Sequence, residues 1–91
     1  MALYRVIVLL PAYKAWEEID SEQERDAIRD ALAKLIDHPD RPVPYPAKER
    51  KDGWEMHVGR LKVTYEIRRI ELVVYVHTIK ESPSWKFDYR Y

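Results

Sequence analysis

The sequence contains no cysteine, which excludes disulfide bonds, cysteine-ligated zinc and a thiol nucleophile. It also lacks a long hydrophobic run, because the longest, Val6 to Leu10, has five residues, far below the roughly 20 that a transmembrane helix needs. A chain without cysteine suits a reducing compartment. We therefore expect a cytoplasmic protein that has no membrane-spanning segment.

The chain has few of the patterns that bind metals or phosphate-containing cofactors. Its three histidines, His38, His57 and His77, are spread along the chain without the spacing of metal ligands. Its two glycines form no glycine-rich phosphate loop, and no serine, histidine and aspartate arrangement indicates a catalytic triad. We therefore expect neither a metal nor another cofactor.

The net charge is zero, with 16 basic and 16 acidic residues, which excludes a uniformly basic nucleic-acid binder. The charges are nevertheless unevenly spread along the chain. Residues 13–40 hold nine acids and four bases, a net charge of −5, whereas residues 41–69 hold eight bases and four acids, a net charge of +4. This asymmetry indicates one acidic and one basic face, although solvated charges on amphipathic elements explain either half alone.

The N-terminal third predicts a strand and a short helix. A length of 91 residues with 46% apolar content indicates one domain over residues 1–91. Residues 3–10 are rich in Val, Ile and Leu and are stopped by Pro11, which favours a buried strand. Because proline fits the first turn of a helix, the helical spacing that follows predicts a helix over residues 12–19.

A second, longer helix is predicted by its capping signals. Ser21 and Glu24 form a capping-box pattern at its start. An apolar stripe runs from Ile28 to Ile36 at helical spacing, and the helix ends at His38, which precedes a proline.

The rest of the chain predicts a sheet. Residues 40–52 carry three prolines and no apolar period, which predicts an irregular loop. Apolar and polar residues alternate over residues 54–58 and 60–68, residues 72–79 are apolar on both faces and predict a central strand, and alternation returns over residues 85–91. The element order is β-α-α-β-β-β, so we predict an α+β domain with two helices packed on one face of an antiparallel sheet.

Residues 58–67 read Val-Gly-Arg-Leu-Lys-Val-Thr-Tyr-Glu-Ile, and residues 72–76 read Leu-Val-Val-Tyr-Val. This pattern resembles the RelE/ParE family of bacterial toxins, whose members typically read Val-Gly-x-Tyr-Arg-Val-x-Tyr-Glu-Ile before a valine-rich strand. The resemblance implies the same fold and a type II toxin–antitoxin system, with a cognate antitoxin as partner. For the activity it implies either ribosome-dependent mRNA cleavage, which inhibits translation, or non-catalytic inhibition of DNA gyrase. A non-toxic binding relative is the third alternative.

Several positions depart from the family pattern. The family's third-strand arginine falls on Lys62, which keeps the charge but not the two-pronged contact to a phosphate, and the preceding tyrosine falls on Leu61. The basic cluster after the last core strand falls on Lys80, Glu81 and Ser82, so its arginine is absent. Cleavage of mRNA on the ribosome is our leading prediction, with the other activities as alternatives.

Cleavage of RNA through its own 2′-hydroxyl needs a base for that hydroxyl, an acid for the leaving 5′ oxygen and cations at the phosphate. Glu55 and His57 are two residues apart in a predicted strand and so share a face, as do Arg60 and Lys62. The resemblance adds that related nucleases place lysine pairs, or glutamate and histidine, in this strand. We predict Glu55 as the general base and His57 as the general acid or its charged equivalent. Lys62 and Arg60 are the predicted phosphate contacts.

Each of these assignments has a non-catalytic alternative. The polar strand face is alternatively a solvated surface with a cross-strand Glu–Lys pair. Lys48, Arg50 and Lys51 either hold an RNA backbone by charge or are ordinary loop residues. Tyr89 and Tyr91, in a tail that packs on the sheet edge or against an antitoxin, are candidate auxiliary residues.

The two remaining histidines are predicted to have structural roles. His77 lies in an apolar strand and predicts a hydrogen-bonded core histidine. His38 lies at a helix C-terminus, where a positive charge suits the helix dipole.

Overall fold

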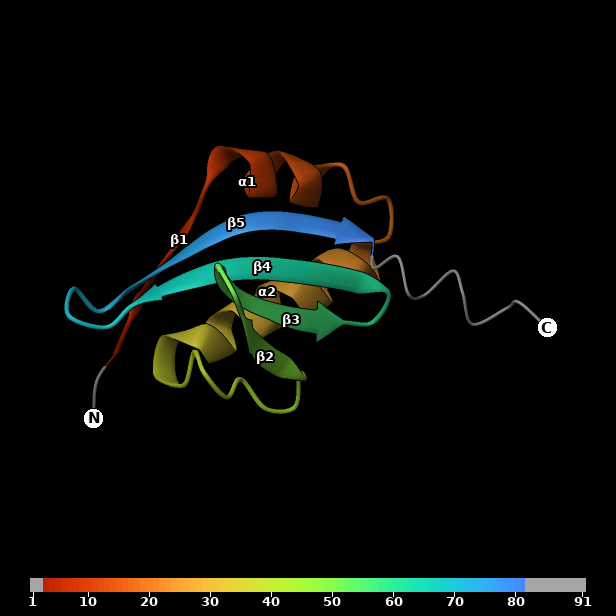
Figure 1. Ribbon diagram of the computed structural model, residues 1–91. Coiled ribbons are helices and arrows are strands. Elements are labelled where there is room, and N and C mark those ends of the chain that lie inside the picture. The colour runs from red at the N-terminus through yellow and green to blue at the C-terminus, as the bar shows by residue number, and fades with distance from the viewer. Residues whose placement is uncertain (1–2, 82–91) are drawn as a thin grey trace.

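The computed structural model describes residues 3–81 (Figure 1). Its elements are β1 (Arg5–Val8), α1 (Leu10–Glu17), α2 (Glu22–Asp37), β2 (Ala47–Arg50), β3 (Gly53–Val58), β4 (Leu61–Arg68) and β5 (Val73–Glu81). The strand predicted over residues 85–91, which includes Tyr89 and Tyr91, lies outside the described residues. Two helices and a five-stranded, mostly antiparallel sheet confirm the predicted α+β class.

The sheet has the strand order β1-β5-β4-β3-β2. β5 therefore lies between β1 and β4, as its apolar faces predicted. The pair β1–β5 is parallel and the other three pairs are antiparallel. After β1 the chain passes through both helices and enters the sheet again at β2, on the opposite edge. The antiparallel succession β2-β3-β4-β5 then brings β5 alongside β1 in the parallel direction.

The prediction of an irregular loop over residues 40–52 is wrong for four of them, because Ala47–Arg50 forms the edge strand β2. Lys48 pairs with Glu55, and Arg50 pairs with Gly53. A short strand made of lysine, glutamate and arginine has no apolar alternation to reveal it. Charged side chains are typical of edge strands, since they discourage pairing with other chains.

Both helices begin and end near their predicted limits. α1 starts at Leu10, two residues before the predicted start, with Pro11 in its first turn. The Ser21 hydroxyl accepts a hydrogen bond from the backbone N–H of Glu24 at 3.2 Å, which confirms the capping box start of α2. His38 caps the C-terminus of α2, as predicted.

One hydrophobic core lies between the helices and the sheet. α2 contributes Ile28, Ala31 and Leu35 to it, and α1 contributes Ala12, all fully buried. In Figure 1, α2 runs behind β3 and β4, and α1 runs alongside β5. The strand residues of this core are Met56, Val58, Leu61, Val63, Tyr65, Val74, Val76 and Ile79. No helix within residues 3–81 covers the opposite face of the sheet, which we call the outer face.

Tyr65 ties the loop after α2 to the middle of the sheet. Its hydroxyl donates a hydrogen bond to the backbone carbonyl of Pro39 at 2.6 Å, and the residue is 1% exposed. Burial raises the pKa of the Tyr65 phenol far above its ordinary value. The phenol therefore stays neutral and keeps donating this bond.

The pairing of β4 with β5 contains one irregularity. Thr64 pairs with Thr78 and Tyr65 pairs with Val76, so His77 is an extra residue between these two pairs. Val76 and Ile79 are both buried, and the two residues between them, His77 and Thr78, are more exposed. Such a β-bulge redirects side chains locally.

Candidate functional site

The outer face carries the predicted catalytic residues together. In the register of β3 and β4, Glu55 pairs with Thr64 and His57 pairs with Lys62. Side chains alternate between the two faces of a strand, so the apolar neighbours of these residues point into the core. The structure therefore brings Glu55, His57 and Lys62 onto one face, as the alternating pattern indicated.

Glu55 is the centre of this group. It is 7% exposed, and it is the buried charged residue among those described in residues 3–81. Its carboxylate lies among four basic side chains: Arg50 Nη1 at 3.5 Å, His57 Nε2 at 3.9 Å and Lys48 Nζ at 3.9 Å from Oε1, and Lys62 Nζ at 3.7 Å from Oε2. We call these five residues the Glu55 cluster.

The distances in the Glu55 cluster are long for direct contacts. Charge-assisted N–H to carboxylate hydrogen bonds are about 2.7–2.9 Å, whereas these separations are 3.5–3.9 Å. The surrounding cations therefore offset the charge of Glu55 without holding its oxygens in place. A carboxylate in this condition has oxygens free to accept a hydrogen bond from a bound ligand.

A groove of about 400 Å³ opens beside the cluster on the outer face. Glu55, Arg50 and Lys62 line one part of it, and His77 lines another. Asp52, Gly53, Trp54, Thr64 and Tyr65 complete the lining. The groove thus combines a carboxylate, cations and an imidazole, which are the groups that phosphodiester chemistry needs.

A second hollow, of about 170 Å³, lies on the helical side of the sheet. Its lining is mainly apolar and comprises Val8, Tyr13, Trp16, Arg29, Leu32 and Ile79. The described residues that line it supply no carboxylate and no imidazole, so they offer no groups for acid–base chemistry. The outer groove is therefore the better candidate site.

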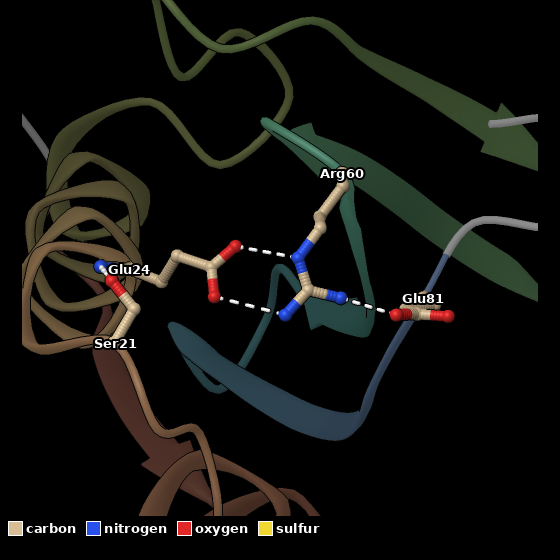
Figure 2. Close-up of polar contacts among 4 residues, drawn as sticks. All are labelled: Ser21, Glu24, Arg60 and Glu81. Atoms are coloured by element: carbon tan, nitrogen blue, oxygen red, sulfur yellow. Dashed lines mark hydrogen bonds and ion pairs between the residues drawn. The ribbon is translucent and has the colours of Figure 1, made fainter.

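Arg60 was predicted beside Lys62 as a phosphate contact, and this placement is wrong. Residues 59–60 form the turn between β3 and β4, so Arg60 precedes the strand and escapes its alternation. Its guanidinium donates to the Glu24 carboxylate through Nε at 2.7 Å and Nη2 at 2.9 Å, and also to Glu81 (Figure 2). The hydrogen bond to Glu24, and the charges of both carboxylates, raise the pKa of Arg60.

We call Arg60, Glu24 and Glu81 the Arg60 clamp. It joins the β3–β4 turn to α2 and to the end of β5 (Figure 2). Its guanidinium is paired with two carboxylates, and Arg60 is not among the described residues that line the outer groove.

The basic residues predicted in the loop separate into two groups. Lys48 and Arg50 lie in β2 and belong to the Glu55 cluster. Lys51 is an exposed residue of the turn that follows β2. Of these three residues, Arg50 lines the groove, and Lys48 contacts the cluster without lining the groove.

His77 was predicted as a core histidine, and this prediction is also wrong. Its side chain is 45% exposed, and its Nε2 lies 3.1 Å from Oε1 of Glu66. The cause is the β-bulge, which places His77 on the outer face next to Thr78. The signal that was overlooked is the succession of two polar residues, His77 and Thr78, within an otherwise apolar strand.

Glu66 connects His77 to Arg68. Arg68 Nε donates to Oε2 of Glu66, and the Arg68 guanidinium lies 5.4 Å from the centre of the Tyr75 ring. The hydrogen bond from Arg68, followed by the one with His77, lowers the pKa of the Glu66 carboxyl. Glu66 is therefore a carboxylate that accepts hydrogen bonds at neutral pH, and His77 Nε2 is the donor in this pair.

Two structural surveys of residues 3–81 bear on the expected cofactor and location. In this range no three His, Cys, Asp or Glu side chains form a group suited to a metal ion. Neither α1 nor α2 has the length and hydropathy of a membrane-crossing helix.

Comparisons with known proteins bear on the family and the fold of this chain. Residues 6–82 match a family model described as the ParE toxin of type II toxin–antitoxin system, parDE. A search among curated proteins gave no match.

Solved structures of similar fold include the archaeal RelE–RelB complex from Pyrococcus horikoshii OT3, with a TM-score of 0.74 and 15% identity over 87% of this chain and 94% of that one. The RelBE2 toxin–antitoxin complex from Mycobacterium tuberculosis has a TM-score of 0.73 and 14% identity over 89% and 100% of the two chains. The YoeB/ParE toxin from Agrobacterium tumefaciens has a TM-score of 0.71 and 11% identity over 86% and 98%. At these identities the similarity shows a shared fold.

Proposed function

This chain belongs to the ParE toxin family of type II toxin–antitoxin systems, within the RelE/ParE group of toxins, and from this premise we propose that it arrests growth by cutting mRNA on the ribosome. The observation that carries the proposal is the Glu55 cluster beside the outer groove. A nearly buried carboxylate held among four basic side chains is costly to maintain unless it has a function. An open sheet face with this cluster is suited to a phosphodiester substrate.

In this proposal Glu55 takes the proton from the RNA 2′-hydroxyl as general base. Its loosely held oxygens, 3.5 Å or more from every cation of the cluster, leave it free to accept that proton. Lys62 and Arg50, which line the groove, stabilise the negative charge that develops on the phosphorus-bound oxygens. His57 supplies positive charge next to the carboxylate when it is protonated.

We also propose that a cognate antitoxin neutralises this chain. The solved structures from Pyrococcus horikoshii and Mycobacterium tuberculosis are complexes of a toxin with its antitoxin. The shared fold supports a similar assembly here.

DNA gyrase inhibition is the second candidate function. It is favoured by the match of residues 6–82 to a model described as the ParE toxin, and by the lack of an arginine at Lys80, Glu81 and Ser82. A gyrase inhibitor needs no acid–base groups. It therefore predicts growth arrest that survives substitution of Glu55 and leaves mRNA intact.

Induction of the chain without its antitoxin separates these functions. We expect growth arrest and discrete mRNA ends that primer extension maps to positions within translated codons. Glu55→Ala, His57→Ala and Lys62→Ala should relieve the arrest, whereas Glu49→Ala, a matched change of an exposed glutamate on β2, should not. Intact mRNA together with DNA damage signalling supports the gyrase alternative. Absence of any growth effect supports the non-toxic relative.

A further inference from the structure

Two histidines lie near the groove, but they relate to Glu55 in different ways. His57 is on the same strand as Glu55, and its Nε2 approaches the same carboxylate oxygen, Oε1, at 3.9 Å. It is not among the residues that line the groove in the described part of the chain. His77 lines the groove from β5, with the strand β4 between it and Glu55.

The strand register gives the distance across the groove from the backbone of Glu55 on β3 to the backbone of β5. Glu55 pairs with Thr64, and Thr64 pairs with Thr78, the neighbour of His77. Adjacent strands are about 4.8 Å apart, so the backbones of Glu55 and Thr78 are separated by roughly 10 Å. Thr64 lies between them and also lines the groove. A phosphodiester held over Thr64 would therefore have Glu55 on one side and His77 on the other.

The β-bulge is an independent reason to consider His77. A regular β5 would alternate strictly between the two faces, whereas the bulge places His77 and Thr78 successively between the buried residues Val76 and Ile79. Bulges of this kind are common next to active sites, where they redirect a side chain. Here the bulge exposes His77 while the apolar residues around it stay in the core.

Glu66 orients the imidazole ring of His77. Because the Glu66 carboxylate accepts from Nε2, the ring keeps its proton on Nε2 when neutral, and Nδ1 is the nitrogen that gains or loses a proton. Arg68 in turn holds the other oxygen of Glu66, so the carboxylate does not swing away. This is the arrangement of a proton donor with an orienting partner.

The chemistry of RNA cleavage places the acid and the base on opposite sides of the phosphorus. The attacking and leaving oxygens are roughly in line in such a displacement. The base and the acid must therefore approach the phosphorus from opposite sides. His57 does not meet this condition, because its Nε2 lies beside Oε1 of Glu55, the proposed base. Glu55 and His77 line the groove from β3 and β5, on either side of β4.

We propose that His77 is the general acid of this site and that Glu66 is its positioning residue. The inference rests on the proposed RNA cleavage. Glu55 takes the proton of the 2′-hydroxyl, the 2′ oxygen forms a bond to phosphorus, and the bond from phosphorus to the 5′ oxygen breaks. His77 gives its Nδ1 proton to that 5′ oxygen. The products are a 2′,3′-cyclic phosphate and a 5′-hydroxyl, and the proton on Glu55 and the proton lost by His77 are exchanged with solvent.

The test uses a leaving group that needs no acid. Ribosomes are programmed with a synthetic mRNA in which sulfur replaces the bridging 5′ oxygen at the mapped cut site, and the cutting rate is compared with that of the oxygen substrate. A thiolate leaves without protonation, so His77→Ala should lose about 10²–10⁴-fold on the oxygen substrate and recover most of this loss on the sulfur substrate. Glu55→Ala should be slow on both substrates.

His57→Ala and His38→Ala complete the set. His57→Ala should be slowed on both substrates, because His57 acts beside the base, and His38→Ala, at the exposed end of α2, should behave as wild type. Glu66→Ala should slow cutting of the oxygen substrate more than that of the sulfur substrate, because it removes the partner that orients His77, while substrate affinity stays unchanged. Recovery of His57→Ala, and not of His77→Ala, on the sulfur substrate overturns the assignment. A wild-type chain that cuts neither substrate overturns the proposed function itself.

Discussion

The Glu55 cluster and the Arg60 clamp use the same residue types for opposite purposes. In the clamp, Arg60 meets Glu24 through two hydrogen bonds of 2.7 and 2.9 Å on the helical side. In the cluster, Arg50 stays 3.5 Å from Glu55, and the other cations are farther away. Geometry, and not composition, therefore separates a contact that holds elements together from one that is open to a substrate.

The difference in geometry follows from the backbone position of each glutamate. Glu24 is in the first turn of α2, whose backbone is fixed by the Ser21 cap, and its side chain meets a planar guanidinium in the paired geometry that arginine favours. Glu55 is in the middle of β3, and its cations come from three separate strands. Their register sets the separations, so no single pair closes into a fork.

The sharpest way to break this comparison is to neutralise each carboxylate without changing its size. Glu55→Gln should slow RNA cutting by about 10²–10⁴-fold, because the amide cannot take the 2′-hydroxyl proton. Glu24→Gln should cut RNA at the wild-type rate but melt at a lower temperature, because it loses the charge-assisted pair with Arg60. Initial cutting rates and thermal unfolding measure the two effects.

This pair of variants also defines the contrary result. A folded Glu24→Gln protein that cuts as slowly as Glu55→Gln would mean that the clamp takes part in the chemistry. A fully active Glu55→Gln protein would remove the general base from the proposal.

Tyr65 offers a smaller test, because it is on the buried side of β4 next to Thr64 in the groove. Tyr65→Phe removes the hydrogen bond to Pro39 and leaves that carbonyl without its partner, which should cost about 1–2 kcal/mol of stability. Cutting by the folded protein should stay unchanged, because the variant keeps the Tyr65 ring and backbone beside the groove and removes only the buried hydroxyl. Urea unfolding at neutral pH measures the loss.

The same variant has a signature at alkaline pH. The pKa of Tyr65 is raised in the folded state, while an unfolded tyrosine ionises near pH 10, so its contribution to stability is complete below about pH 10 and is lost as the pH rises above it. Tyr65→Phe should therefore lose less stability than wild type between about pH 10 and pH 12. Equal losses in the two proteins contradict the buried phenol.

Much of the fold was predictable because its signals are local and repeated. The Ser21 cap, the apolar stripe of α2 and the strict alternation over residues 60–68 each rest on several residues that agree. The apolar faces of β5 placed it in the centre of the sheet. The outer-face location of Glu55, His57 and Lys62 followed from the same alternation.

The remaining features depend on single residues or on pairing with distant ones. β2 is a strand because it pairs with β3, and its charged residues carry no pattern of their own. Arg60 is two residues from Lys62, but the turn at residues 59–60 sends it to the helical side. One extra residue in β5 moves His77 from the predicted core to the groove. A pattern of alternating apolar and polar residues does not indicate the turn or the bulge at which the alternation is interrupted.

The smallest expected effect is a change in the salt dependence of RNA binding, and it compares two lysines, one inside the Glu55 cluster and one outside it. Lys48 lies in the Glu55 cluster, whereas Lys51 lies in the turn that follows β2. Each contact of a basic side chain with a phosphate releases a counterion, so Lys48→Ala should reduce the slope of log affinity against log salt by about 1. Lys51→Ala should leave the slope unchanged. Binding is measured with an RNA that carries a 2′-deoxy nucleotide at the cut site, which prevents cleavage.

The two variants remove the same charge, so overall electrostatic attraction changes equally in both. A difference in slope between them therefore reports a local phosphate contact at the cluster and not the net charge of the chain. Equal slopes for Lys48→Ala and Lys51→Ala would show that the RNA backbone does not follow the outer face past β2. The phosphate contacts of the groove would then be limited to Arg50 and Lys62, on either side of Glu55.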